Sequence, residues 1–189
     1  MKRHSGSLIG ILRTLPSVRT GAEVGVWTGE NSLELLKTFP ELELSMVDDY
    51  RSESTDEGNN RLQSKTQVDF DEAKRVAQAN TEQYKHRRFI IHKSSVRAAK
   101  SYQYHGLDFV FLDADHSYES VRRDLNAWHS RVRVGGIMCG HDYNGRGDRS
   151  GRFGVKRAVD EFFAGRTIGE EPGLVWWVRV KEMAACPTK

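Results

Sequence analysis

The sequence predicts a single α/β domain built on a doubly wound, mainly parallel sheet with helices on both faces. Apolar runs of strand length alternate with longer amphipathic stretches, which is typical of crossover units around such a sheet. The 189 residues suit one domain, 1–189, with one core. Hydrophobic residues make up 38% and charged residues 29%, as in water-soluble globular proteins.

Charge and composition argue against several classes of partner. The net charge is +3, and Lys and Arg are spread among Asp and Glu, so no nucleic-acid partner is expected. No apolar run approaches eighteen residues, so no membrane span is expected. Cys139 and Cys186 lack the spacing of a zinc site. We expect a cytoplasmic protein with a small-molecule substrate, and a homo-oligomer remains open.

The first half of the chain predicts three strands and the helices that connect them. A leading helix spans 7–15, and the strand at 22–26 ends in a glycine loop before a helix capped by Asn31 or Ser32. Further apolar runs indicate strands at 42–47 and 89–92, with a helix at 69–84 between them. The polar segment 49–67 is predicted to be a long loop that can act as a lid.

The second half predicts the centre and the closing edge of the sheet. A weakly apolar helix at 96–104 precedes the apolar run 108–112, which is typical of a central strand buried on both faces. Ser117 can cap a helix that runs to about residue 132, and Gly135-Gly136 then turns into a strand at 137–140. The remaining predictions are a loop at 144–153, a helix at 155–163, and an antiparallel hairpin of 167–170 with 174–180.

A glycine loop follows the first predicted strand. Glu23-x-Gly25-x-x-x-Gly29 removes side chains where a ligand must approach the backbone at the start of a helix. The two glycines are four residues apart, so the loop does not match the dinucleotide pattern G-x-G-x-x-G. The alternative is an ordinary tight turn between a strand and a helix.

Polar residues follow the second and third predicted strands. A carboxylate at the end of a second strand can accept hydrogen bonds from two vicinal ribose hydroxyls, and Asp48 holds that position, with Asp49 beside it. Alternatively, these acids are solvated. Ser94 and Ser95 follow the third strand and can line an adenine, although small polar residues are common at strand ends.

Acid and histidine clusters end two neighbouring strands. The first reads Asp113-Ala114-Asp115-His116, and the second reads His141-Asp142. Ligands of open α/β sheets bind at the carboxyl ends of the strands, so the two clusters predict one site. Asp113 and Asp142 suit a hard cation such as Mg²⁺. The alternatives are that Asp115 caps a helix and that His116 or His141 is hydrogen-bonded scaffold.

Taken together, these motifs resemble class I S-adenosylmethionine-dependent methyltransferases, particularly a compact subfamily related to metal-dependent O-methyltransferases of antibiotic sugars. The resemblance rests on the segments 23–32, 47–48, 108–119, 135–143 and 154–160. It implies a Rossmann-like sheet of seven strands with the last strand antiparallel. It also implies that the 25–29 loop packs against the methionine part of the cofactor and that Asp48 holds the ribose.

The resemblance also implies a set of site residues. Asp113 and Asp142 match the Mg²⁺ ligands of the sugar-modifying relatives, and His116 matches their base. A third ligand is not evident, which leaves Asp115, His141 and Asp49 as candidates. The candidate catalytic residues are His116 and Asp113. The candidate cofactor-binding residues are Glu23, Gly25, Trp27, Gly29, Ser32, Asp48, Ser94, Ser95 and Asp113.

The expected reaction is an in-line attack by a substrate hydroxyl on the methyl group of S-adenosylmethionine. Mg²⁺ would lower the pKa of the hydroxyl and His116 would take its proton. Segments 49–67 and 144–153 are expected to select the acceptor, a sugar or another natural-product-like molecule. The competing hypotheses are a nicotinamide-dependent oxidoreductase and a nucleotide-binding module without chemistry of its own.

Overall fold

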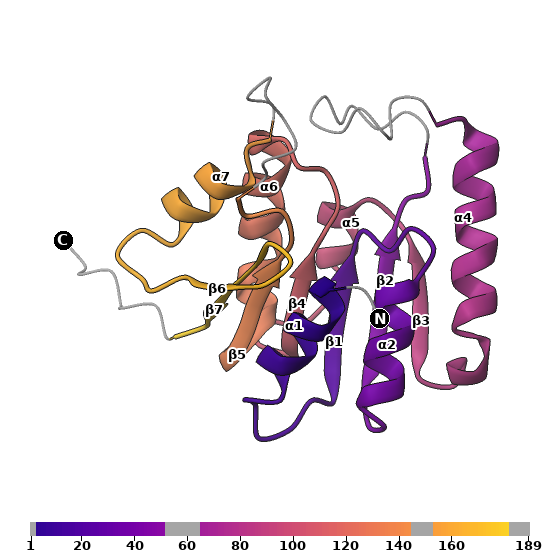
Figure 1. The fold of residues 1–189 in the computed structure, drawn as a ribbon, viewed down its shortest axis with the longest axis horizontal. Helices are drawn as coiled ribbons and strands as arrows, with labels where there is room; N and C mark the ends of the chain where they lie inside the picture. Colours follow the sequence, from indigo (N-terminus) through magenta and orange to yellow (C-terminus); the bar gives the residue numbers. More distant parts are fainter. Residues whose placement is uncertain (1–2, 52–64, 145–152, 182–189) are drawn as a thin grey trace.

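The structure is a computed structural model that describes residues 3–51, 65–144 and 153–181. Its centre is one sheet of seven strands in the order β3-β2-β1-β4-β5-β7-β6 (Figure 1). The predicted loops at 49–67 and 144–153 lie mostly outside the described residues. The strands are β1 (Thr20–Val24), β2 (Glu43–Asp48), β3 (Arg88–His92), β4 (Leu107–Leu112), β5 (Val132–Gly140), β6 (Gly169–Glu171) and β7 (Val175–Arg179).

The pairing of the strands confirms the predicted doubly wound, Rossmann-like sheet. β1 to β5 pair in parallel, whereas β7 runs antiparallel to both β5 and β6. The last strand of the chain is therefore antiparallel to the five-stranded parallel part, as expected. The strand order reverses between β1 and β4, where a doubly wound sheet opens a crevice at its carboxyl edge.

Helices cover both faces of the sheet. Core side chains of α1 (Arg3–Leu12), α2 (Glu30–Thr38) and α4 (Gln67–Asn80) pack on one face. Those of α5 (Ser95–Ala99), α6 (Tyr118–Trp128) and α7 (Val155–Phe162) pack on the other. Figure 1 shows α1 and α2 in front of the strands and α4 at the side of β3. Two short 3₁₀ turns, η1 (Glu82–Tyr84) and η2 (His129–Arg131), follow α4 and α6.

Strand β4 is the centre of the core, as its unbroken apolar run predicted. All six of its residues are buried. Phe109 and Phe111 pack with the α1 and α2 side, and Val110 and Leu112 pack with the α5 to α7 side, because side chains alternate along a strand. Burying one such side chain contributes about 1.5–3 kcal/mol. This strand therefore gives the loop that follows it a rigid base.

Several predicted boundaries are wrong in detail. Gly29, in the left-handed region at φ 71°, is the N-cap of α2, not Asn31 or Ser32. Strand β5 starts at Val132 instead of 137, so Gly135 and Gly136 lie within it. A Cβ on Gly136 would lie 2.6 Å from the carbonyl oxygen of Asp108, which explains this glycine by close approach of two strands and not by a turn.

Two helices also differ from their predicted lengths. α1 begins at Arg3 and ends at Leu12, instead of spanning 7–15. The helix predicted at 96–104 is reduced to the five residues of α5. No helix in the described part of the chain is long and apolar enough to cross a membrane.

At the amino end of the sheet, Asp108 near the start of β4 links neighbouring segments by hydrogen bonds. Its Oδ2 accepts hydrogen bonds from the backbone N–H groups of Arg19 and Thr20, at 2.7 and 2.9 Å. Its Oδ1 accepts one from Nε of Arg133, at 2.6 Å. The carboxylate thus joins β4 to the segment that enters β1 and to β5. Its charge and both of its oxygens are compensated there.

Candidate active site at the carboxyl end of the sheet

A cavity of about 860 Å³ opens at the carboxyl ends of the parallel strands. This volume lies in the range of small-molecule sites. Its position matches the crevice expected where the strand order reverses between β1 and β4. Its walls include His4, residues 23–28, Glu30, Asn31, residues 47–49, Phe70, residues 93–96, residues 113–116, Ser120, Arg123 and Asp124.

Gly25 forms the floor of the cavity where β1 passes β4. Its φ is 90°, and an added Cβ would lie 2.1 Å from the carbonyl oxygen of Asp113. No other residue fits, because both the backbone angle and the space exclude a side chain. Trp27, two residues on, also has a positive φ, 50°, and its ring meets that of Phe70 edge-on in the cavity wall.

Asp48 holds the glycine loop in place. Its Oδ2 accepts hydrogen bonds from the backbone N–H groups of Val26 and Trp27, at 2.9 and 3.0 Å. Its Oδ1 accepts one from Tyr50, at 2.8 Å. Burial raises the pKa of the carboxyl, and these three hydrogen bonds counteract part of that rise. Asp48 lines the cavity as predicted, but three backbone N–H groups already occupy most of the acceptor positions of its carboxylate.

The neighbouring polar candidates also lie at the cavity. The carboxylate of Asp49 has no hydrogen-bond partner among the described residues, whereas its carbonyl oxygen lies 2.6 Å from Nε2 of His92. Ser94 and Ser95 line the wall near Val96. The hydroxyl of Ser95, however, donates to Oδ1 of Asp124. Both serines lie at the cavity, as the sequence predicts, but the hydroxyl proton of Ser95 is engaged in the hydrogen bond to Asp124.

Three predicted cofactor residues support the loop from below. Glu23 is buried, and its carboxylate accepts hydrogen bonds from Asn31 and from the hydroxyl of Ser32. Burial raises the pKa of Glu23 to about 7. Ser32 is fully buried and does not line the cavity, and neither does Gly29, which packs against Ala77 of α4. Ser32 and Gly29 therefore shape the loop without forming the cavity wall.

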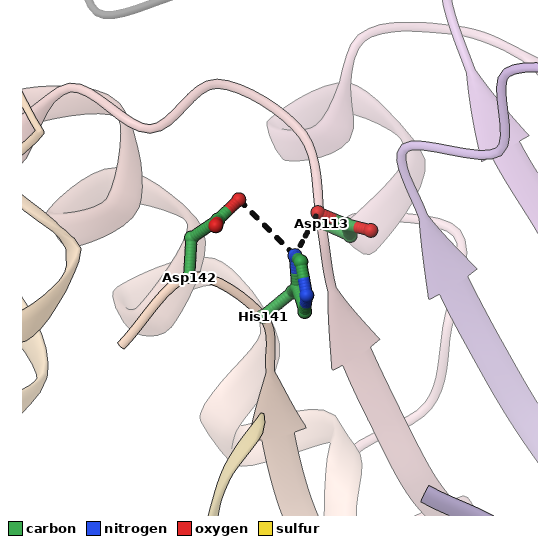
Figure 2. Close-up of side chains that lie close together, drawn as sticks. All are labelled: Asp113, His141 and Asp142. Carbon is green, nitrogen blue, oxygen red and sulfur yellow. Dashed lines mark ion pairs between the residues drawn. The ribbon is translucent and has the colours of Figure 1, made fainter. Parts of the chain in front are cut away.

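Two carboxylates and an imidazole converge from the ends of β4 and β5 (Figure 2). Nδ1 of His141 lies 3.1 Å from Oδ2 of Asp142 and 3.5 Å from Oδ1 of Asp113. One ligand atom from each of these residues lies within 4.8 Å of the other two. No other group of three such side chains occurs in the described part of the chain. The predicted pair Asp113 and Asp142 is thus brought together, with His141 as the third member.

His116 joins this cluster from the loop before α6. Its Nε2 lies 3.0 Å from Oδ2 of Asp142 and 3.5 Å from Oδ1 of Asp113. Its ring stacks on Phe153 at 4.8 Å with an interplanar angle of 14°. The backbone N–H of Gly154 donates to the carbonyl oxygen of His116, which fixes the loop on the α7 side. The predicted base therefore lies in a defined orientation beside both predicted metal ligands.

The charges of the cluster compensate one another. Burial opposes ionisation of Asp113 and Asp142, but the hydrogen bonds from His116 and His141 outweigh it and lower the pKa of both carboxyls. Burial likewise opposes protonation of His141, yet its contacts with the two carboxylates raise its pKa to about 10. The cluster therefore places positive charge between two carboxylates, and a cation would satisfy the same groups.

The other two candidates for a third metal ligand, Asp115 and Asp49, lie outside the cluster. Asp115 uses Oδ1 to accept from the backbone N–H of Ser117 and Oδ2 to accept from the hydroxyl of Ser120, so it organises the start of α6. Asp49 follows β2, and strands β1 and β4 separate β2 from β5. Only His141 among the three candidates belongs to the cluster.

The structure adds site residues that the sequence did not indicate. His4, in the first turn of α1, lines the cavity, and its ring lies 4.8 Å from that of His141. Asp124 of α6 lines the cavity from the opposite helical layer. The hydroxyl of Tyr143 donates to Asp160 of α7, which anchors the residue after Asp142. His4 and Asp124 belong to no local motif, so only the fold reveals them, whereas Tyr143 lies in the segment 135–143 of the resemblance.

Comparisons with known proteins identify the family of the chain. Residues 22–143, more than half of the chain, match the family model described as a methyltransferase domain. A stretch of 68 residues is 34% identical to uncharacterized protein R132 of Acanthamoeba polyphaga mimivirus. That alignment covers 30% of this chain and 31% of the viral protein, so the chain spans less than a third of this curated relative.

Solved structures of similar fold include two from bacteria. One is a candidate caffeoyl-CoA O-methyltransferase from Staphylococcus aureus, with a TM-score of 0.68 and 14% identity over 95% of this chain and 85% of that one. Another is the O-methyltransferase from Bacillus cereus in complex with SAH, with a TM-score of 0.63 and 14% identity over 95% and 82% of the two chains. At these identities the likeness shows the fold.

Proposed function

The chain belongs to the methyltransferase-domain family, and from this premise we propose that it moves the methyl group of S-adenosylmethionine to a hydroxyl oxygen of a small molecule. The family match bears out the resemblance to methyltransferases and disfavours an oxidoreductase or a module without chemistry. The observation that carries the proposal is the single cavity, with the Gly25 loop and Asp48 on one side and the Asp113 and His116 cluster on the other.

Oxygen as the accepting atom is supported by the donor chemistry of the cluster. Carboxylates with an adjacent imidazole can bind a divalent cation and take up a proton, which is what a weakly acidic hydroxyl requires. The Bacillus cereus neighbour is itself an O-methyltransferase. We propose a sugar or a similar natural-product-like acceptor, handled in the cytoplasm with neither nucleic acid nor a membrane as partner.

The donor set of the cluster fits a divalent cation. Asp113, Asp142 and His141 offer two carboxylate oxygens and one nitrogen close together. Carboxylates suit Mg²⁺, and an imidazole also admits a cation such as Mn²⁺. A bound cation would act as a Lewis acid that lowers the pKa of the acceptor hydroxyl. Binding requires neutral His141, because a protonated imidazole cannot be a ligand.

The residues of the chain would promote the reaction by holding the cofactor and the acceptor hydroxyl in position. S-adenosylmethionine supplies a methyl group on a sulfonium, which needs a close, collinear nucleophile. The Gly25 loop lets the cofactor approach the backbone, and Asp48 fixes that loop. The imidazole of His116 would take the proton from the hydroxyl, and Oδ2 of Asp142, 3.0 Å from its Nε2, would stabilise the imidazolium that forms.

Calorimetric titration with S-adenosylhomocysteine tests the cofactor part of the proposal. The wild-type protein is expected to bind, and Asp48→Ala should abolish binding because it removes the acceptor of two loop N–H groups. Asp71→Ala, on the exposed side of α4, is the matched control and should bind as the wild type does. Absence of binding to the wild-type protein would remove the proposal.

Titration with Mn²⁺ or Mg²⁺ alone tests the metal part. Asp142→Asn should weaken cation binding at least about tenfold, because it removes a charged ligand. Asp115→Asn is the matched control, since Asp115 uses its oxygens within the α6 start. Equal cation affinity in the wild-type protein and Asp142→Asn would exclude the metal while leaving the cofactor proposal intact.

A further inference from the structure

A buried carboxylate of α6 lines the cavity but is not one of the residues of the reactive cluster. Asp124 is only 7% exposed, yet it lines the cavity together with Ser95 and Val96 of α5. No hydrogen bond joins it to Asp113 or His116, and the proposed chemistry makes no use of it. A carboxylate in such a place is costly unless a hydrogen-bond donor compensates it.

A short chain of hydrogen bonds fixes this carboxylate. Nε1 of Trp128 donates to Oγ of Ser95 at 2.9 Å, and that hydroxyl donates to Oδ1 of Asp124 at 2.5 Å. Trp128 is fully buried, so the chain is anchored in the core. Because the hydroxyl has only one proton, Ser95 cannot also donate to a ligand. Ser95 therefore acts on the cavity through Asp124.

The second oxygen of Asp124 remains available. Oδ2 has no hydrogen-bond partner in the described part of the chain, where Oδ1 alone is engaged. Oδ2 is also not among the buried side-chain atoms that lack a hydrogen-bond partner in the described residues, so protein does not fully enclose it. The oxygen is therefore accessible, on a residue that lines the cavity. It can accept one hydrogen bond from a ligand.

The position of Oδ2 indicates which part of the cofactor it meets. Asp48 lies after β2 beside the predicted ribose, and Asp113 and His116 lie at the methyl-transfer side. The wall formed by Ser95, Val96 and Asp124 then remains for the adenine ring of the cofactor. The exposed side of Val96 offers this flat ring an apolar surface. The hydrogen-bond donor that adenine presents at its edge is its exocyclic amino group.

We propose that Asp124 selects adenine in the cofactor, with Oδ2 accepting a hydrogen bond from the exocyclic amino group. This inference rests on the proposed function, since it assumes that S-adenosylmethionine occupies the cavity. A 6-oxopurine would turn a carbonyl oxygen toward the carboxylate, and two acceptors repel. Sites built to hydrogen-bond one group discriminate strongly against an analogue that lacks it.

The test compares S-adenosylhomocysteine with S-inosylhomocysteine, which differs only at this edge of the base. Dissociation constants are measured by calorimetry at pH 8, where the carboxyl is ionised although burial raises its pKa to about 7. The variants are Asp124→Asn and Ser95→Ala. Asp108→Asn is the matched control, because Asp108 is also 7% exposed but lies at the opposite end of the sheet.

The wild-type protein and Asp108→Asn should both prefer the adenine ligand by about ten- to a hundredfold, the range of a hydrogen bond to a charged group. In Asp124→Asn this preference should fall at least about tenfold, because an amide can turn its N–H₂ toward a carbonyl oxygen. Ser95→Ala keeps the charge but frees the carboxylate to rotate, so its preference should fall by a smaller factor.

Equal affinity of the wild-type protein for both ligands would overturn the inference, even if Asp124→Asn did not fold. A folded Asp124→Asn variant that keeps the full preference would overturn it as well. In both cases binding of S-adenosylhomocysteine would leave the proposed function standing. Failure of the wild-type protein to bind either ligand would instead remove the proposed function and this inference with it.

Discussion

His116 is held on three sides at the mouth of the cavity. Phe153 stacks on its ring, Gly154 binds its carbonyl oxygen, and Oδ2 of Asp142 lies 3.0 Å from its Nε2. A group that accepts a proton in a transition state must lie in one place, because misplacement lengthens the hydrogen bond along which the proton moves. These contacts hold a buried loop residue in one orientation.

Replacing His116 with Asn should slow methyl transfer by about 10²- to 10⁴-fold, the usual contribution of a general base. The affinity for S-adenosylhomocysteine should stay nearly unchanged, because the variant leaves untouched the Asp48 loop that we propose as the cofactor site. Turnover is measured on the best acceptor from a screen, and affinity by calorimetry. His86→Asn, an exposed histidine beyond α4, is the control. Unchanged turnover in His116→Asn would exclude this residue as the base.

Glu23 makes the stability of the protein depend on pH. Burial raises its folded pKa to about 7 from an ordinary value of 4.5. Between these values the unfolded chain has released a proton that the folded chain still holds. The free energy of unfolding should therefore fall as pH rises from about 4.5 to 7, by up to about 1.4 kcal/mol per pH unit.

Glu23→Gln should flatten this part of the pH profile, because an amide does not titrate. Urea denaturation at pH 5 and pH 7.5 measures the difference for the wild-type protein and the variant. Glu43→Gln, at the exposed start of β2, should keep the wild-type profile. A Glu23→Gln profile as steep as the wild-type one would show that other buried acids, such as Asp124, carry the dependence.

At the scale of elements, strand ends were easier to predict than helix starts. Short apolar runs located all five parallel strands, and the continuous run of β4 marked the strand that is buried on both faces. The start of α2 was misplaced because Asn31 and Ser32 look like caps, whereas both donate hydrogen bonds to the buried Glu23. Side chains recruited by tertiary contacts cannot serve the local role that their type suggests.

The turn from β1 into α2 depends on one glycine. Gly25→Ala should abolish binding of S-adenosylhomocysteine and lower the free energy of unfolding by about 2 kcal/mol or more, since the backbone angle and a contact of 2.1 Å both oppose a Cβ. Gly10→Ala, in the middle of α1 with no atom in the way, should instead stabilise by about 0.5–1 kcal/mol. Urea denaturation measures both, and a stable, binding Gly25→Ala would contradict the assigned geometry.

At the scale of the whole molecule, the two ends of the sheet differ in how well their polar groups are satisfied. The amino end has Asp108 with a partner for both oxygens. The carboxyl end has buried acids with raised pKa values, and Trp27, Tyr50 and Asp142 lie there in the left-handed region, which costs free energy for residues with a Cβ. Strained backbone and buried acids thus gather at the end of the sheet where the cavity opens.

The topology explains why part of this site was visible in the sequence. Asp48, Asp113 and Asp142 lie at the carboxyl ends of strands, and parallel strands bring these ends to one edge. His4 and Asp124 reach the same cavity from within helices, where their positions depend on how each helix packs. A sequence pattern reports the face that a helix buries, but not which of its residues overhangs a cavity.

The difference between the two ends predicts a separation of stability from function. Asp108→Asn should lower the free energy of unfolding by about 2 kcal/mol, because Arg133 loses a charged partner, and it should leave the affinity for S-adenosylhomocysteine unchanged. The hydrogen bonds of Asp108 lower its pKa although burial opposes them, so this stabilisation should be present at neutral pH and lost as pH falls below about 4.

Asp113→Asn should show the opposite pattern. It removes a carboxylate from a cluster where His116 and His141 keep the second carboxylate, Asp142, as a partner, so the free energy of unfolding should change less than in Asp108→Asn. Cation binding should weaken at least about tenfold, because Asp113 supplies one of three ligand atoms. Urea denaturation and cation titration on both variants measure the contrast. If Asp113→Asn were the less stable of the two, the cluster would serve mainly to close the carboxyl end of the sheet, as Asp108 closes the amino end.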